Sequence, residues 1–265
     1  MALPQIGFGT YQLEGEDCVN AVRTALDAGY RLIDTAALYE NEVEVGRAIR
    51  ESGIPREEIQ VTTKIRGRNH GFDEAQEACR ESLRKLGMDY VDLLLIHWPN
   101  PMNDRYIDTW EAMVELKDDG LTADIGVSNF TPKTLDTIIA RSGVTPLVNQ
   151  IELHPYFQQA AMRELHASLG ITTQAWSPLG RKSDLLTDPV LVAVADKHGV
   201  STAQAALRWS IQLGDIVIPK SSSAARIIAN FDVFGFTLDE AAMTAIAGLE
   251  RGTLSSLDPE TSEVL

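Results

Sequence analysis

The sequence predicts a (β/α)8 barrel, also called a TIM barrel, from three observations. Eight strand-like segments alternate with helical patterns, mostly about 22–33 residues apart. Several strand segments are continuously apolar, which is typical of parallel strands buried on both faces. The length of 265 residues suits one barrel domain, so we expect residues 1–265 to form a single domain. A doubly wound sheet is the alternative, but no G-x-G-x-x-G follows the first strand.

The predicted strands are rich in Val, Ile and Leu, and most end at a polar residue. In chain order they span 3–8, 30–34, 60–64, 91–97, 123–128, 146–152, 172–177 and 215–220.

The predicted helices show the apolar spacing of helices with one buried face. In the first, Val19, Val22 and Leu26 share a face, and Gly29 ends the pattern. Another begins with Thr131 as a cap and a proline at its first position. The set spans 17–28, 42–51, 73–86, 107–119, 132–141, 160–169, 189–198, 202–213, 223–230 and 238–249.

Charge and composition exclude several classes of protein. The net charge of −15 argues against a nucleic-acid binder, because such proteins need a basic face. Cys18 and Cys79 have no metal or redox spacing and are interpreted as reduced thiols on helices. No signal-peptide pattern and no apolar run of roughly 20 residues occurs. We expect a cytoplasmic monomer that does not bind membranes.

Polar residues gather where the predicted strands end. In a barrel, the carboxyl ends of the strands form the active-site face. A convergence of polar side chains there favours a site over isolated structural roles. The residues are Asp34, Lys64, His97, Ser128, Asn129, Gln150, Trp176 and Lys220.

Three of these side chains, together with Tyr39, suggest acid catalysis. Asp34 and Lys64 end neighbouring strands and are expected to form a buried ion pair, with Tyr39 folding back over them. A nearby ammonium should lower the pKa of the Tyr39 phenol from about 10. His97 would add a second hydrogen bond, giving an oriented proton donor beside a polarised carbonyl.

Seven segments resemble the aldo-keto reductases, most of all the bacterial diketogluconate reductases and the prostaglandin F synthase-like members. They are "RLIDTAALYENEVEVGRAI", "VTTKI", "LLLIHWP", "IGVSNF", "VNQIELHP", "WSPLG" and "IPKSSSAARIIAN". The likeness covers about residues 3 to 250. It implies a barrel that moves a hydride from NADPH to an aldehyde or ketone, with the catalytic residues Asp34, Tyr39, Lys64 and His97.

The resemblance also implies a set of cofactor contacts. The nicotinamide carboxamide would be bound by Ser128, Asn129 and Gln150, with its ring on Trp176. The ribose and the pocket wall would contact Gly9, Thr10 and Tyr11. The pyrophosphate would lie on a loop containing Ser177, Leu179 and Gly180.

The segment "IPKSSSAARIIAN" also has the physical character of an anion site. Residues 216–231 contain no acid, and they combine two cations, three serines and a helix start. By resemblance, the adenosine 2′-phosphate would be bound by Lys220, Ser221, Ser222, Ser223 and Arg226, and adenine by Asn230. Ala229 stands where the family usually has glutamate, which removes one expected adenine contact.

The expected substrate contacts are Tyr11, Arg66, His97 and Trp98. Many sugar-reducing relatives have an aromatic residue where this chain has Arg66, which is either solvated or binds anionic substrates. The family's usual N-terminal hairpin does not precede "LPQIGFGT". The tail 251–265 is expected near the pocket, and the short rim suggests small aldehydes, diketones or keto-sugars.

Other histidines and tryptophans have plainer interpretations. His154 is expected to be a core histidine, and Trp110 and Trp209 to pack in helices. The remaining histidines, His70, His166 and His198, are expected on the surface.

Two other functions stay open at this point. A barrel lyase would use Lys64 as a Schiff-base nucleophile, but that amine must be neutral and Asp34 would keep it charged. A nucleotide-binding module without turnover would not need the four catalytic-type residues. No metal requirement is expected, because the histidines do not cluster at ligand spacing.

Overall fold

Eight parallel strands form a barrel in the computed structural model, which describes residues 3–252 and 257–265. Each strand pairs with the next in sequence, and a bridge between Ile6 and Val217 joins the last strand to the first segment. The strands are β1 (Phe8–Gly9), β2 (Leu32–Asp34), β3 (Gln60–Ile65), β4 (Val91–Ile96), β5 (Thr122–Ser128), β6 (Val148–Glu152), β7 (Thr172–Trp176) and β8 (Ile216–Ile218). The predicted fold class is confirmed.

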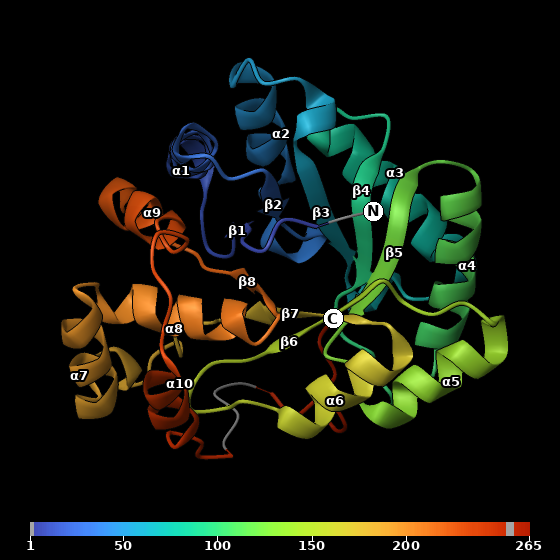
Figure 1. The fold of residues 1–265 in the computed structure, drawn as a ribbon. Coiled ribbons are helices and arrows are strands. Elements are labelled where there is room, and N and C mark those ends of the chain that lie inside the picture. The colour runs from blue at the N-terminus through green and yellow to red at the C-terminus, as the bar shows by residue number, and fades with distance from the viewer. Residues whose placement is uncertain (1–2, 253–256) are drawn as a thin grey trace.

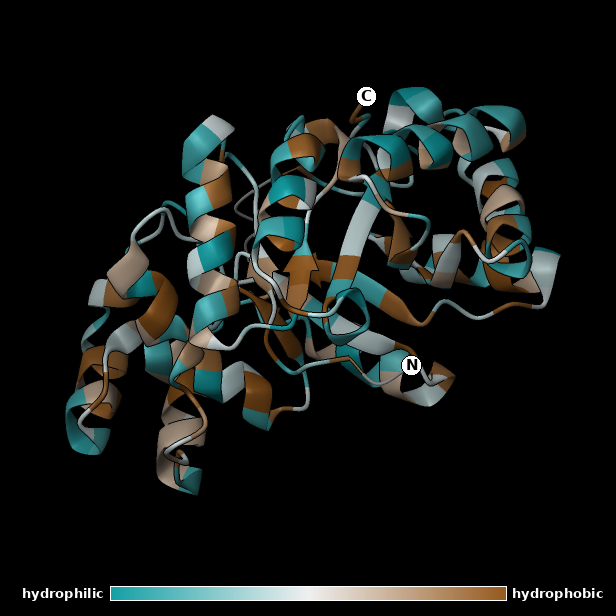
Figure 2. Cartoon of the chain, turned by 90° about the horizontal axis from the view of Figure 1, so that it is seen from above, coloured by the Kyte–Doolittle hydropathy of each residue, from teal (hydrophilic) through white to brown (hydrophobic). Residues whose placement is uncertain are grey.

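The helices surround the strands, as Figure 1 shows, and match the predicted ranges to within a few residues. They are α1 (Gly15–Ala28), α2 (Glu42–Glu51), α3 (Phe72–Leu86), α4 (Tyr106–Asp118), α5 (Pro132–Ser142), α6 (Ala160–Leu169), α7 (Pro189–His198), α8 (Thr202–Gln212), α9 (Ala224–Phe231) and α10 (Glu240–Ala247). Thr131 caps α5 by accepting a hydrogen bond from the Thr134 amide, with Pro132 at the first position. Figure 2 shows stripes of hydrophobic and hydrophilic residues along these helices, as expected for helices with one buried face.

The first strand is much shorter than the predicted span 3–8. Only Phe8 and Gly9 pair with β2. The preceding residues instead bond to β8, since the Val217 amide donates to the Gln5 carbonyl and the Gly7 amide to the Val217 carbonyl. This segment therefore closes the barrel. A Cβ on Gly7 would lie 2.7 Å from Ile218 and 2.8 Å from Leu32, so the glycine permits this close approach.

The barrel interior changes from apolar to polar along the strands. Leu32 packs with Ile216 and Ile218, while Leu93, Leu95 and Val148 form a second apolar group. Because side chains alternate between faces, residues two positions further along the strands share the inward face. Asp34 follows Leu32 in this way, and Gln150 follows Val148. The pleat thus places carboxylate and amide groups above an apolar floor.

Two of the surface assignments made from the sequence are wrong. His70 is 1% exposed and His166 is fully buried, while His198 is half-buried. His166 bridges Asn149 and Thr173 at 3.0 and 2.9 Å, which compensates for its burial. The helical pattern around His166 gives no sign of Asn149 and Thr173, the buried partners that make its burial possible. His154, Trp110 and Trp209 are buried as predicted.

Cys18 lies in α1 and Cys79 in α3, and both are free and buried. None of the described helices has the length and apolarity needed to cross a membrane. Within residues 3–252 and 257–265, no group of three or more His, Cys, Asp or Glu side chains could hold a metal ion.

Candidate active site

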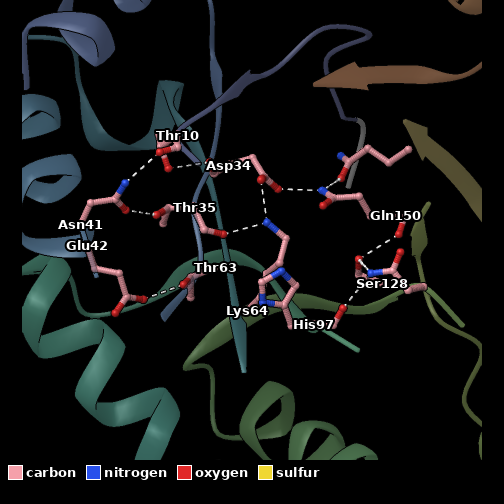
Figure 3. A network of polar contacts seen from close by, with 12 residues as sticks. Thr10, Asp34, Thr35, Asn41, Glu42, Thr63, Lys64, His97, Ser128 and Gln150 are labelled. Atoms are coloured by element: carbon pink, nitrogen blue, oxygen red, sulfur yellow. Dashed lines mark hydrogen bonds and ion pairs between the residues drawn. The ribbon is translucent and has the colours of Figure 1, made fainter. Parts of the chain in front are cut away.

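A buried ion pair lies at the carboxyl ends of β2 and β3. The Lys64 ammonium donates to Asp34 Oδ1 at 2.6 Å and to the Thr35 carbonyl at 2.9 Å. The other Asp34 oxygen accepts a hydrogen bond from Gln150 Nε2 at 2.7 Å, from across the barrel. Figure 3 shows these side chains pointing toward one another. The pair that the sequence predicted is therefore formed, and its remaining hydrogen-bonding capacity is partly satisfied, as a buried ion pair requires.

The loops on either side of this pair are held by Asn41. Its side-chain amide donates to the Thr10 carbonyl at 2.9 Å and accepts from Thr35 Oγ1 at 2.7 Å. Thr10 in turn donates to the Asp34 carbonyl at 3.0 Å. These contacts, drawn in Figure 3, fix the short 3₁₀ turn Ala37–Tyr39 above the ion pair.

Tyr39 is surrounded by rings and by the ion pair. Its ring meets His97 edge-on with 5.5 Å between centroids, and Tyr11 similarly at 5.1 Å. Lys64 Nζ lies 5.1 Å from the centre of the Tyr39 ring. Tyr39, Lys64, Asp34 and His97 are thus brought together as the sequence predicted.

The predicted direction of the Tyr39 pKa shift is wrong. Burial, followed by the charge of Asp34 and the neighbouring Tyr11, raises the pKa of Tyr39 well above its ordinary value. Burial lowers the pKa of Lys64, and Asp34 opposes that shift. Because Asp34 offsets the ammonium charge, Lys64 does not overcome the desolvation of the phenol. The phenol therefore keeps its proton in this state.

His97 lies against the same cluster as a neutral ring. Burial, then the charges of Lys64 and Arg66, lowers the pKa of His97 well below its ordinary range. Its Nδ1 is buried and has no hydrogen-bond partner among the described residues. A neutral imidazole beside the phenol can hydrogen-bond an uncharged oxygen without adding charge.

A second network joins the residues expected at the nicotinamide. Trp176 Nε1 donates to Asn129 Oδ1 at 2.9 Å, and Asn129 Nδ2 donates to the His97 carbonyl at 3.0 Å. Ser128 Oγ donates to the Gln150 carbonyl at 2.9 Å. Asn129 has a left-handed backbone with φ of 62°, a conformation that asparagine adopts more readily than most residues. The wall on this side of the site is therefore already ordered.

These groups line a cavity of about 510 Å³. The predicted residues on its surface are Gly9, Tyr11, Asp34, Tyr39, His97, Trp98, Ser128, Asn129, Gln150, Trp176, Ser177, Leu179 and Lys220. The sequence reasoning missed further lining residues, namely Gln12, Leu38, Pro178, Arg181, Ile218 and Pro219. Leu257 and Val264 also line the cavity, and they belong to the tail 251–265 that was expected near the pocket. The other predicted site residues are not part of this lining, namely Thr10, Lys64, Arg66, Gly180, Ser221, Ser222, Ser223, Arg226 and Asn230.

Three cations gather at the end of the cavity near α9. The neighbouring Arg181 and Arg226, after a larger effect of burial, lower the pKa of Lys220. Arg226 Nε donates to Ser221 Oγ at 3.2 Å, and the Ser223 amide donates to the same oxygen at 3.1 Å. The predicted anion site thus gains Arg181, a cation that directly follows "SPLG" in the sequence and was not assigned a role.

Arg181 also covers Tyr11, with its guanidinium carbon 4.9 Å from the ring centre. This stacking places the Arg181 loop over one side of the cavity.

The surroundings of three predicted substrate- or adenine-contacting residues can now be described. The Arg66 side chain is 13% exposed, with Nη1 3.8 Å from Glu40, and its Nη2 donates to the main-chain oxygen of Leu265 at 3.4 Å. Asn230 is buried within α9 rather than open at its surface. Trp98 is nearly buried and lies on the cavity wall.

Comparison with known proteins places the chain among one group of enzymes. The family model "Aldo/keto reductase family" matches residues 5–251. The 2,5-diketo-D-gluconic acid reductase B of a Corynebacterium species is 53% identical over 97% of this chain and 93% of its own length.

Solved structures agree with that match. An aldo/keto reductase from Brucella melitensis has a TM-score of 0.90 and 51% identity, covering 93% of this chain and 95% of that one. A variant of Gox0644 in complex with NADPH has a TM-score of 0.94 and 43% identity, covering 98% and 94%.

Proposed function

The chain belongs to the aldo/keto reductase family and is an NADP-dependent oxidoreductase, and we propose that it reduces small aldehydes and ketones to alcohols, with Tyr39 as the proton donor. The observation that carries this proposal is the buried Asp34–Lys64 pair directly beneath Tyr39 and beside His97. The diketo substrate in the name of the Corynebacterium relative supports small dicarbonyls and keto-sugars as the substrate class.

The lining of the cavity suits NADPH in chemistry and in charge. Tyr39, Trp176 and Lys220 all line this one cavity, so one bound molecule can contact all three. Asn129 holds the indole ring of Trp176 through a hydrogen bond. The Trp176 ring provides a flat apolar face for nicotinamide. Arg181, Lys220 and Arg226 would meet the phosphate groups, and in a protein of net charge −15 such attraction must be local.

The chain's own residues supply the proton and the polarisation. When bound, NADPH supplies a hydride to the carbonyl carbon. Tyr39 would donate a hydrogen bond to the carbonyl oxygen and pass its proton to that oxygen as the carbon is reduced. His97 would orient the same oxygen. Lys64 would stabilise the phenolate left behind, with Asp34 and the Thr35 carbonyl fixing the ammonium in place.

The contacts of Lys64 count against a lyase that uses this amine as a nucleophile. Its side chain is fully buried, and its Nζ is already hydrogen-bonded to Asp34 and Thr35. A Schiff base needs a neutral amine that can reach the substrate.

NADPH oxidation with a panel of carbonyls tests the proposal. We expect turnover with methylglyoxal, phenylglyoxal and 2,5-diketogluconate, measured as loss of nicotinamide absorbance. Absence of NADPH oxidation with every aldehyde and ketone would refute the proposed reaction. Trapping of a substrate adduct by borohydride would favour the lyase instead.

A further inference from the structure

Residues 257–265, the last part of the tail, form part of the cavity wall; below, "the tail" means these residues. Leu257 and Val264 contribute apolar surface to the same cavity that Tyr39 and His97 line. In Figure 1 the C-terminus projects onto the middle of the barrel. A substrate too large for the space beside Tyr39 would therefore meet the tail.

The tail is held by a two-point contact with Asn100, which lies three residues after His97. Asn100 Nδ2 donates to the Val264 carbonyl at 2.8 Å, and the Val264 amide donates to Asn100 Oδ1 at 2.9 Å. One side-chain amide thus pairs with both main-chain groups of a single residue, as a neighbouring strand would. This pairing fixes the position and the orientation of the Val264 backbone relative to Asn100.

The surroundings of Asn100 suit this contact. Asn100 is fully buried and has a left-handed backbone with φ of 46°, which asparagine tolerates. A Cβ added to Gly67 would collide with both Asn100 Nδ2 and the Val264 carbonyl oxygen, so the glycine leaves room for them. A second contact joins Glu263 to the Met102 amide at 3.0 Å. The loop between β4 and α4 therefore makes both contacts with the tail, and Gly67 after β3 leaves room for them.

We propose that Asn100 is a positioning residue that fixes the tail as a substrate-contacting wall and so sets the preference for larger over smaller carbonyls. The proposal rests on the proposed reductase function. Bulky carbonyls gain apolar contact with Val264 and Leu257 only while these residues are held in place. The smallest carbonyls reach Tyr39 and His97 without touching the tail.

The variant Asn100→Gly tests this proposal, because glycine adopts the left-handed backbone and removes only the side-chain contact. The ratio of kcat/KM for phenylglyoxal to that for methylglyoxal should fall about five- to tenfold, mainly through the KM for phenylglyoxal. The kcat for methylglyoxal should stay within about twofold of the wild-type value. Hydrogen exchange at the Val264 amide should become faster in the variant.

Asp104→Gly is the matched control. Asp104 lies on the same loop with φ of 55° and should change neither the ratio nor the exchange at Val264. Asn100→Asp, which keeps the Oδ1 acceptor but loses the donor, should give a fall in the same direction. An unchanged ratio in both Asn100 variants, or unchanged exchange at Val264, would overturn the proposal. If the wild-type protein oxidised NADPH with neither carbonyl, the proposed function would fail, while the exchange measurement would still test the contact itself.

Discussion

At the scale of single residues, the proposal depends on the proton of Tyr39. Tyr39→Phe keeps the ring that packs against His97 and Tyr11 but removes the only hydroxyl proposed to protonate the substrate. We expect kcat to fall by roughly 10²–10⁴, because positioned acid catalysis contributes that much. The dissociation constant for NADPH, measured by quenching of tryptophan fluorescence, should change by less than about threefold.

Tyr90→Phe is the control for loss of a phenol, since Tyr90 packs under Arg56 away from the cavity. A Tyr39→Phe protein that kept rates within a few-fold of the wild-type rate would show that another group donates the proton.

The residue types at this site could be predicted from the sequence, but their energetics could not. Asp34, Lys64 and His97 end predicted strands and Tyr39 follows one, and strand ends converge in a barrel. The pKa of Tyr39 depends on the balance between burial, Asp34 and the ammonium of Lys64, and that balance is set by distances. The contact between Asn100 and Val264 joins residues 164 positions apart, which no local pattern indicates.

At the scale of elements, the turn from β8 into α9 forms the proposed binding site for the 2′-phosphate. Arg226→Ala removes a cation beside Ser221 and Lys220. A hydrogen bond to a charged group contributes about 1.5–3 kcal/mol, so the dissociation constant for NADPH should rise roughly ten- to a hundredfold. The constant for NADH, which lacks that phosphate, should stay almost unchanged. Calorimetry with both nucleotides measures the difference.

Arg23→Ala removes the same charge from α1, where Arg23 pairs with Glu51 of α2 and does not line the cavity, and it should alter neither constant. If Arg226→Ala weakened the binding of NADPH and NADH equally, Arg226 would support the fold of the turn and would not bind the 2′-phosphate.

Element positions were largely predictable, whereas their ends and loops were not. Apolar runs identify the strands, and the capping threonine and proline identify the start of α5. The predicted strand over residues 3–8 was too long because the segment around Ile6 bonds to β8, a partner more than 200 residues away. Arg181 was missed because only the folded loop brings it over Tyr11 and near Lys220.

At the scale of the whole molecule, buried neutral histidines should make the fold sensitive to acid. Burial lowers the pKa of His70 and of His166 to about 4. Below the ordinary value of about 6.5 the unfolded chain therefore binds more protons than the folded chain, and stability falls as the pH drops from about 6.5 toward 4. For His70 alone the loss at pH 5 is about 2 kcal/mol.

The variant His70→Leu should remove this part of the acid sensitivity. Denaturant unfolding at pH 7.5 and at pH 5 should show a drop in the free energy of unfolding that is about 2 kcal/mol smaller than in the wild-type protein. Identical drops in the wild-type and His70→Leu proteins would contradict a buried neutral His70.

The central claim, hydride reduction of a carbonyl above the Asp34–Lys64 pair, is tested most directly by isotope transfer. NADPH carrying deuterium at both C4 positions is mixed with the protein and methylglyoxal, and the product is analysed by mass spectrometry. We expect one deuterium on the new alcohol carbon, formed by the wild-type protein and nearly absent with Tyr39→Phe over the same time. An alcohol without deuterium, or a substrate covalently attached to Lys64 after borohydride treatment, would contradict the account.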